Sequence, residues 1–204
     1  MPEASNSAKL SIIMPVLDVA ARLEASLQSL QPLRDRGHEL LIVDGGSRDG
    51  TVTLARKYAD RVLLSGTGRS LQMNTGTEYA TNDILLFLPV DSRLPPQADD
   101  MIVQALQSAR YQWGHFALRI GKATLAQRVF AQVVNWRTGA TGTAITEQAI
   151  FVTRQLFERV KGFDSMPEGE DMAFTRKLSQ FAKPLRLKSP VLSFSTKWQH
   201  QKGG

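Results

Sequence analysis

Short apolar runs alternate with amphipathic segments along the first half of the chain. Four runs rich in Ile, Leu and Val predict strands: residues 9–17, 38–43, 61–64 and 83–88. After the first run, Leu23, Leu27 and Leu30 recur at helical spacing, and similar amphipathic segments follow the second and third runs. The pattern therefore predicts successive strand, loop and helix units.

The predicted strands are continuous apolar runs and do not alternate between apolar and polar residues. Such strands are typical of parallel sheets, in which helices cover both faces. We therefore expect an α/β fold.

The second half has a less regular pattern. It predicts a helix after Pro95 and Pro96 and five further elements: a strand at 113–120, a helix at 124–136, a strand at 149–152, a helix at 170–181 and a strand at 185–194. A helix end turning at Gly162 is also expected. The residues 138–143, rich in glycine and threonine, predict a mobile loop. No internal repeat or linker interrupts the pattern, which favours a single domain.

The composition agrees with one globular domain. The chain has 204 residues, 22% of them charged, and contains no cysteine. The absence of cysteine excludes a disulfide framework, a cysteine zinc site and a thiol nucleophile. Apolar runs are too short for a transmembrane helix, and residues 1–8 lack the features of a secretory signal. A cytoplasmic protein is expected.

The charge balance narrows the choice of partners. There are 25 Lys and Arg against 19 Asp and Glu, a net charge of +6. This surplus suits nucleic acid, an anionic membrane surface or a phosphorylated small molecule. The basic residues are scattered, and the aromatic residues do not interleave with them. Nucleic acid is therefore the least favoured partner, and a phosphate-bearing ligand in a cleft is preferred.

Polar residues follow the predicted parallel strands, where ligands bind in open α/β sheets. They are Asp18, Asp44, Asp49, Arg69 and Asp91. Glycines beside Asp44 would let the backbone approach a ligand, and its carboxylate could accept hydrogen bonds from a base or ribose. Asp49 suits a helix cap at least as well as a ligand contact.

Carboxylates at two further places allow two interpretations each. Asp91 could hold a divalent cation that bridges phosphates, or simply pair with Arg93. Glu170 and Asp171 could complement the start of the following helix, or one of them could serve as a general base. The three histidines lack the spacing of a metal site, so a structural or solvent-exposed role is expected for each.

Six segments together carry a family resemblance: SIIMPVLD, LLIVDGGSRDGT, GRSLQMNTG, ILLFLPVDSRLP, EQAIFVTRQLFERVKGFD and GEDMAF. In this order, over residues 9–195, they resemble the family 2 glycosyltransferases of the GT-A fold. The GR-x-x-QMN-x-G and QAIFV stretches resemble its small branch associated with radical-SAM and selenodomain proteins. The resemblance implies a Rossmann-like, mostly parallel sheet flanked by helices.

The resemblance also implies an activity: inverting transfer of a sugar from a nucleoside-diphosphate sugar to a hydroxyl acceptor, assisted by Mn²⁺ or Mg²⁺. The nucleotide-binding residues that it implies are Pro15, Asp18, Asp44, Gly45, Ser47, Asp49 and Arg69. The implied metal ligand is Asp91, with His200 as a further ligand. The implied catalytic residues are Asp171, as general base, and its neighbour Glu170, while Glu147 and Gln148 face the acceptor.

Three positions depart from the family pattern. Asp18 and Val19 stand in place of Asn-Glu, Pro89 in place of the first Asp of the D-x-D motif, and Glu147 where Asp is common. Metal binding through Asp91 and neutralisation of phosphate by Arg69 and Lys197 therefore remain alternatives.

The glycosyltransferase resemblance divides the chain into two terminal segments and two halves of one domain. Residues 1–8 form a flexible N-terminus, 9–95 the nucleotide-binding half, 96–196 the acceptor-side half and 197–204 a flexible or truncated C-terminus. Two other functions stay open: a non-catalytic nucleotide-binding regulatory module and a sugar-phosphate nucleotidyltransferase. Two locations also stay open, the cytoplasm and a peripheral position at the inner membrane face.

Overall fold

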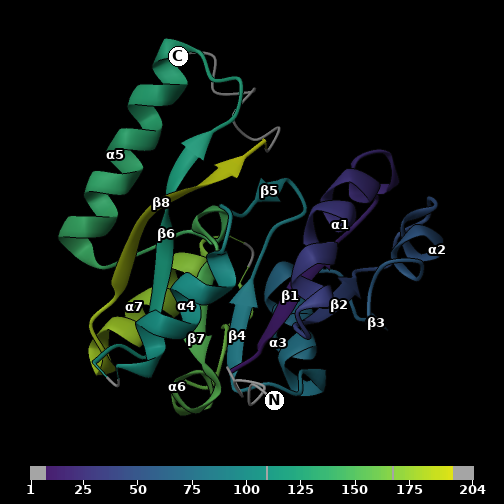
Figure 1. Ribbon diagram of the computed structural model, residues 1–204, viewed down its shortest axis with the longest axis horizontal. Coiled ribbons are helices and arrows are strands. Elements are labelled where there is room, and N and C mark those ends of the chain that lie inside the picture. The colour runs from purple at the N-terminus through teal and green to yellow at the C-terminus, as the bar shows by residue number, and fades with distance from the viewer. Residues whose placement is uncertain (1–7, 109, 167, 195–204) are drawn as a thin grey trace, which may run out of the picture.

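An eight-stranded sheet runs through the protein, with helices on both of its faces (Figure 1). The computed structural model describes residues 8–108, 110–166 and 168–194. Within this part of the chain, no helix is long and apolar enough to cross a membrane.

The first half of the chain builds a parallel sheet, as predicted. Its strands are β1 (Leu10–Val16), β2 (Glu39–Asp44), β3 (Arg61–Leu64) and β4 (Ile84–Phe87), in the order β3-β2-β1-β4. The helices that connect them are α1 (Ala20–Asp35), α2 (Thr51–Ala55) and α3 (Arg69–Tyr79). All three strand pairs are parallel, which confirms the α/β fold.

Alternate residues of the central strands pack into different layers. Ile12 joins a hydrophobic cluster with Leu23 of α1, whereas the next residue, Ile13, joins a second cluster with Met73 of α3. Because side chains alternate across a strand, an unbroken apolar run buries both faces.

The second half adds strands of both directions. β7 (Ile150–Thr153) pairs antiparallel with β4 and with β6 (Trp113–Ile120). β8 (Leu185–Ser193) is parallel to β6, and the short β5 (Ser92–Arg93) is antiparallel to β8. The remaining helices are α4 (Ala98–Gln107), α5 (Leu125–Thr141), α6 (Arg154–Arg159) and α7 (Glu170–Phe181).

The prediction of a mobile loop at 138–143 was wrong. Helix α5 continues through Thr141 and ends at Gly142, whose φ of 68° suits a glycine after a helix. Thr138 is buried, and its hydroxyl donates to the Val134 carbonyl at 2.8 Å and lies 3.1 Å from Gln148 Oε1. These contacts outweigh the low helix propensity of the segment.

Helix α3 rests directly on the strands through a glycine. A Cβ atom at Gly76 would lie 2.4 Å from Ile13 Cγ2 and 3.0 Å from Val43 Cγ2. The absence of a side chain therefore lets the helix approach β1 and β2, with Arg69 in its first turn near the carboxyl ends of the strands.

Candidate functional site

Two loops at the carboxyl ends of β1 and β2 are joined by hydrogen bonds. The Asp18 N–H donates to Ser47 Oγ at 2.8 Å, and the Arg48 N–H donates to Asp18 Oδ1 at 2.8 Å. The Gly45 N–H donates to the Val16 carbonyl at 3.0 Å. The expected nucleotide-binding residues Asp18, Gly45 and Ser47 therefore belong to one pair of hydrogen-bonded loops.

The buried carboxylate of Asp44 shapes its own loop. It accepts hydrogen bonds from the N–H groups of Gly46 at 2.9 Å and Ser47 at 2.8 Å, and from the Ser47 hydroxyl. The sequence favoured a ligand contact for this residue. The structure adds a local role in holding the loop.

Asp49 accepts hydrogen bonds at the starts of two helices but is the N-cap residue of neither, since Gly50 and Val19 hold those positions. Its Oδ1 accepts from the Thr51 N–H at 2.9 Å and its Oδ2 from the Ala20 N–H at 3.0 Å, at the starts of α2 and α1. Hydrogen bonding by Thr51 and Ala20 holds the pKa of Asp49 below its usual value.

Gln72 is a buried residue of this region that sequence reasoning missed. Its Nε2 donates to the carbonyls of Val16 at 2.8 Å and Val43 at 2.7 Å, and so ties the ends of β1 and β2 to α3. A Cβ at Gly45 would lie 3.2 Å from the Gln72 amide. Its position within the GRSLQMN segment, one of those that carry the family resemblance, was the sequence signal that could have identified Gln72.

A hollow of 220 Å³ lies between the ends of β1 and β4. It brings together Pro15, Arg69 and Asp91, as the resemblance implied, and adds Arg22 and Glu147. Leu17 and Val19, which flank Asp18, also line the hollow. The other expected nucleotide-binding residues do not line it: Asp18, Asp44, Gly45, Ser47 and Asp49.

Asp91 pairs with Arg22, whose Nε lies 3.2 Å from Asp91 Oδ1. The sequence alternative, Arg93, acts on Asp91 only as a nearby positive charge. Burial raises the pKa of Asp91 above its usual value. Arg22 and Arg93 oppose this rise, and Glu147 adds to it.

The single carboxylate of Asp91 suits a divalent cation whose other ligands are water and phosphate oxygens. Among the described residues, no three His, Cys, Asp or Glu side chains form a metal-binding group. Mg²⁺ commonly keeps several waters and takes only one or two carboxylates together with substrate phosphates. Asp91 meets that requirement. The other expected metal ligand, His200, and the alternative cation Lys197 lie outside the described residues.

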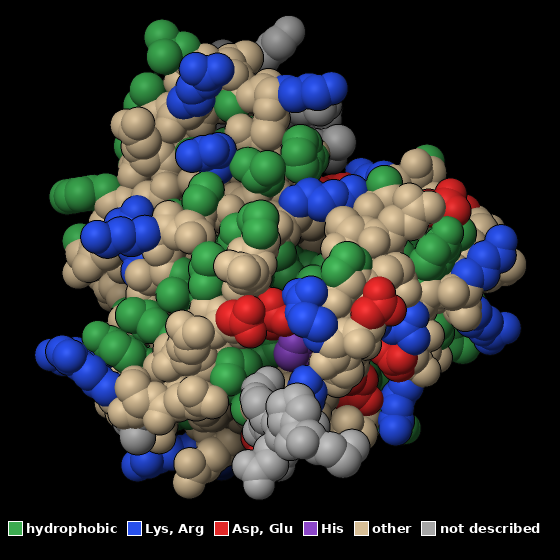
Figure 2. Space-filling model, in the orientation of Figure 1, with side chains coloured by type: hydrophobic (Ala, Val, Ile, Leu, Met, Phe, Trp, Pro, Cys, Tyr) green, Lys and Arg blue, Asp and Glu red, His purple; other side chains and the backbone are tan. Residues whose placement is uncertain are grey.

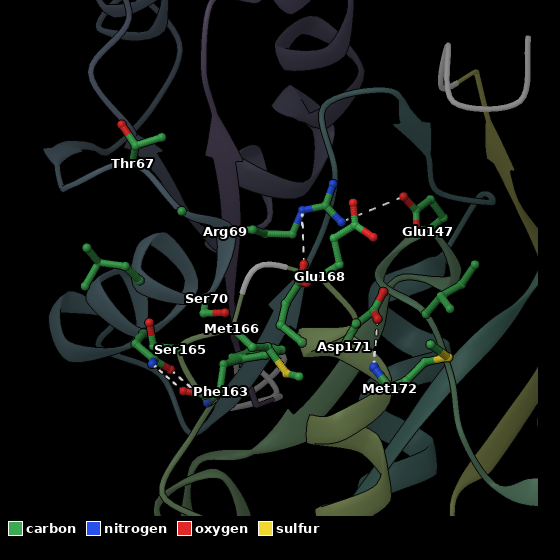
Figure 3. Close-up of a pocket in the computed structure, with 16 residues that line it drawn as sticks. Thr67, Arg69, Ser70, Glu147, Phe163, Ser165, Met166, Glu168, Asp171 and Met172 are labelled. Atoms are coloured by element: carbon green, nitrogen blue, oxygen red, sulfur yellow. Dashed lines mark hydrogen bonds and ion pairs between the residues drawn. The ribbon is translucent and has the colours of Figure 1, made fainter. Parts of the chain in front are cut away.

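A larger cavity of 1180 Å³ opens between the first turns of α3 and α7 (Figure 3). Arg69 Nη1 lies 3.8 Å from Glu147 Oε1, and Arg69 Nε lies 3.6 Å from Glu170 Oε1. Arg69 and Glu147 line this cavity and also the smaller hollow. The two spaces therefore share a wall made of an arginine and a glutamate.

The carboxylate of Asp171 is held at the edge of the larger cavity. Its Oδ2 accepts from the Thr146 N–H at 2.9 Å and from the Thr146 hydroxyl at 3.3 Å. Its Oδ1 accepts from the Met172 N–H at 2.7 Å (Figure 3). Thr146, in a 3₁₀ turn at Thr146–Gln148, is a positioning contact that the sequence did not reveal.

Gln148 does not face the acceptor side, contrary to expectation. It is fully buried, and neither cavity includes it in its lining. Its Oε1 is 3.2 Å from the Ile145 N–H, and its Nε2 is 3.2 Å from His115 Nδ1. The 3₁₀ turn directs Gln148 inward and Glu147 into the cavity.

Known proteins resemble both the sequence and the structure. The model of glycosyl transferase family 2 matches residues 11–155. A PGL/p-HBAD biosynthesis glycosyltransferase of Mycobacterium bovis is 31% identical over 157 residues, which are 65% of this chain and 60% of that protein. The chain thus spans about three fifths of the length of this relative.

Two solved structures resemble the fold. The mannosyltransferase PcManGT from Pyrobaculum calidifontis, in complex with GDP-Man and Mn²⁺, has a TM-score of 0.72 at 18% identity, covering 93% of this chain and 57% of that one. TarS of S. aureus in complex with UDP-GlcNAc has a TM-score of 0.73 at 18% identity, covering 96% and 60%. The GT-A fold is thereby confirmed, and the family model extends over most of the chain, so this protein belongs to glycosyl transferase family 2.

Proposed function

We propose that the protein transfers a sugar, with inversion, from a nucleoside-diphosphate sugar to a hydroxyl acceptor. One observation carries the proposal: Thr146 holds the Asp171 carboxylate in a cavity that adjoins the Asp91 hollow through Arg69 and Glu147. The complexes of PcManGT with GDP-Man and Mn²⁺ and of TarS with UDP-GlcNAc support this assignment.

On the donor side, Pro15 and the joined loops with Asp18, Asp44 and Asp49 would hold the nucleoside. Arg69 would face the diphosphate, and Asp91 would hold Mn²⁺ or Mg²⁺ together with phosphate oxygens. The ion, when bound, neutralises negative charge on the leaving diphosphate.

On the acceptor side, Asp171 would accept the proton of the attacking hydroxyl group. A direct displacement needs such a base within hydrogen-bond reach of the nucleophile. Glu170 would keep Arg69 in place through their ion pair, and Glu147 would face the acceptor. Because the GR-x-x-QMN-x-G and QAIFV stretches resemble the branch associated with radical-SAM and selenodomain proteins, the proposal includes membership of that branch.

The first experiment is calorimetric titration with UDP, GDP and CDP, each with and without Mn²⁺. We expect one nucleotide to bind more tightly when Mn²⁺ is present. The corresponding sugar nucleotide is then incubated with the protein, and release of the nucleoside diphosphate is followed. Failure of all three nucleotides to bind would refute the proposal. Binding without turnover of any sugar donor or acceptor would favour the regulatory module, and pyrophosphate release from a nucleoside triphosphate would favour the nucleotidyltransferase.

A further inference from the structure

Helix α5 presents apolar residues on two opposite faces. Its inner face, with Ala131 and Val134, is buried against the sheet. Its outer face is exposed: Leu125 by 77%, Val129 by 53%, Val133 by 54% and Trp136 by 73%. These four residues are spaced by four, four and three positions, so they form one continuous stripe, here called the α5 stripe.

A cavity lined by cations lies beside this helix. It has a volume of 550 Å³ and is bordered by α5, β6 and β8. Four basic residues line it, and its lining includes no acidic residue: Arg119, Lys122, Arg128 and Lys188. None of the four forms an ion pair within residues 8–108, 110–166 and 168–194.

Acidic residues are unevenly distributed along the chain, whereas basic residues occur throughout it. Residues 101–146 and 172–204 contain twelve Lys and Arg and no Asp or Glu. The rest of the chain has thirteen basic and nineteen acidic residues, so the net charge of +6 divides into +12 and −6. Figure 2 shows basic and hydrophobic side chains together on the side where α5 lies, with acidic side chains gathered away from it.

We propose that the α5 stripe and the cation-lined cavity form a docking surface for an anionic lipid bilayer. Interfacial helices place an apolar face with aromatic residues at the acyl boundary, while nearby Lys and Arg attract lipid phosphates. A second copy of the chain would bring the same positive charge against this surface, which disfavours self-association. Charge complementarity thus selects the bilayer as the occupant.

The electrostatic part is tested by co-sedimentation of the full chain with vesicles of phosphatidylcholine, alone or mixed with phosphatidylglycerol. We expect binding to the mixed vesicles only, weakening as salt is added. Each basic residue near an anionic surface contributes about fivefold in affinity, so Arg128→Gln with Lys188→Gln should weaken binding about 25-fold. The matched control is Arg56→Gln with Lys57→Gln, two exposed cations beside α2, and it should lose no more than a few fold.

The apolar part is tested by a matched pair of leucines. Leu125→Ser in the α5 stripe should weaken vesicle binding about tenfold, whereas Leu64→Ser, at a leucine 70% exposed in β3, should leave it unchanged. Circular dichroism and nucleotide binding report whether each variant is folded. Absence of binding to the mixed vesicles, or equal losses in target and control variants, would overturn the proposal. A wild-type dimer that Leu125→Ser dissociates would also overturn it, since the stripe would then be an interface between copies.

Discussion

Arg69 Nε lies 3.6 Å from Glu170 Oε1, which links the first turn of α3 to the first turn of α7. Glu147, at 3.8 Å from Arg69 Nη1, completes a group of one cation between two carboxylates. Arg69 is thereby held between the two cavities before any ligand binds. In the proposed reaction, this arrangement positions the guanidinium for the diphosphate.

Replacing Arg69 should impair function more than stability. Arg69→Ala would remove the proposed charge-assisted contact to the diphosphate, so we expect kcat/KM to fall about 10- to 100-fold. Its ion pairs are long and its side chain is 28% exposed, so the free energy of unfolding should change by less than about 1 kcal/mol. The matched control is Arg61→Ala on β3, which removes the 3.6 Å ion pair with Glu39 of β2 and should leave kcat/KM unchanged.

Replacing Asp171 should affect the chemical step. Asp171→Asn keeps the shape of the side chain but removes the proposed base, so we expect kcat to fall about 10²- to 10⁴-fold with unchanged nucleotide affinity. Glu168→Gln, in the same cavity, is the control for loss of one negative charge and should keep most activity. Wild-type kcat in Asp171→Asn would contradict the assignment.

Thr146 should act through Asp171. Thr146→Val removes the hydroxyl that lies 3.3 Å from Asp171 Oδ2 but keeps the backbone hydrogen bond. We expect kcat to fall and the pH profile of kcat to shift, with KM for the donor unchanged. Thr146→Ser, which keeps a hydroxyl group, should have wild-type kcat and a wild-type pH profile. If Thr146 is purely structural, Thr146→Val should lower thermal stability without moving the pH profile.

Binding of metal and nucleotide should depend on the ionisation of Asp91. Burial raises the pKa of this carboxyl group, so Mn²⁺-dependent nucleotide affinity should decline at a higher pH than for an ordinary aspartate as the solution is acidified. Asp91→Asn should lower that affinity at least tenfold at neutral pH and flatten its acid dependence. Calorimetry across the pH range measures both effects, with Asp35→Asn as an exposed control. An unchanged Mn²⁺ effect in Asp91→Asn would favour neutralisation of phosphate by arginine.

Asp99 should stabilise the fold in a manner that depends on pH. Burial opposes its ionisation, but hydrogen bonds from Arg36 and His38 outweigh burial and lower its pKa from 3.8 to about 2. The stabilisation is therefore complete above the unfolded value of 3.8 and is lost as the pH falls through about 2. Because Arg36 is 46% exposed and partly screened, Asp99→Asn should cost about 1 to 2 kcal/mol at pH 7.

Urea unfolding at several pH values measures the effect at Asp99. The difference between wild type and Asp99→Asn should narrow below about pH 4. The exposed neighbour Asp100 is the control, and Asp100→Asn should change stability by less than about 0.5 kcal/mol. A constant difference across the acid range would show that packing, and not ionisation, is the cause.

The close approach of α3 to the sheet can be tested at one glycine. Gly76→Ala would place a Cβ 2.4 Å from Ile13 Cγ2, so we expect a loss of about 1 to 3 kcal/mol in the free energy of unfolding. Gly50→Ala, whose Cβ would meet its nearest atom at 3.8 Å, should be nearly neutral. Equal stability of the two variants would contradict the packing described for α3.

The sequence alone determined the parallel half of the fold. A strand made of an unbroken apolar run must be buried on both faces. The helices predicted between these strands act as the crossover connections that parallel strands require. The residues at the strand ends were visible for the same reason, because a buried strand must stop where polar residues begin. Arg69 and Asp91 were identified in this way, whereas Glu147 was identified only through the family resemblance.

Tertiary structure decided how those residues are used. Contacts between residues distant in sequence bring Thr146 to Asp171 and Gln72 to the ends of β1 and β2, and the inward turn of Gln148 depends on burial beside His115. The extension of α5 through Thr141 likewise depends on packing, since local propensity opposes it. The cations Arg119, Lys122, Arg128 and Lys188 are scattered in sequence and share a cavity only because β6, α5 and β8 are neighbours. Sequence patterns report local burial, whereas side-chain partners depend on which segments the fold places together.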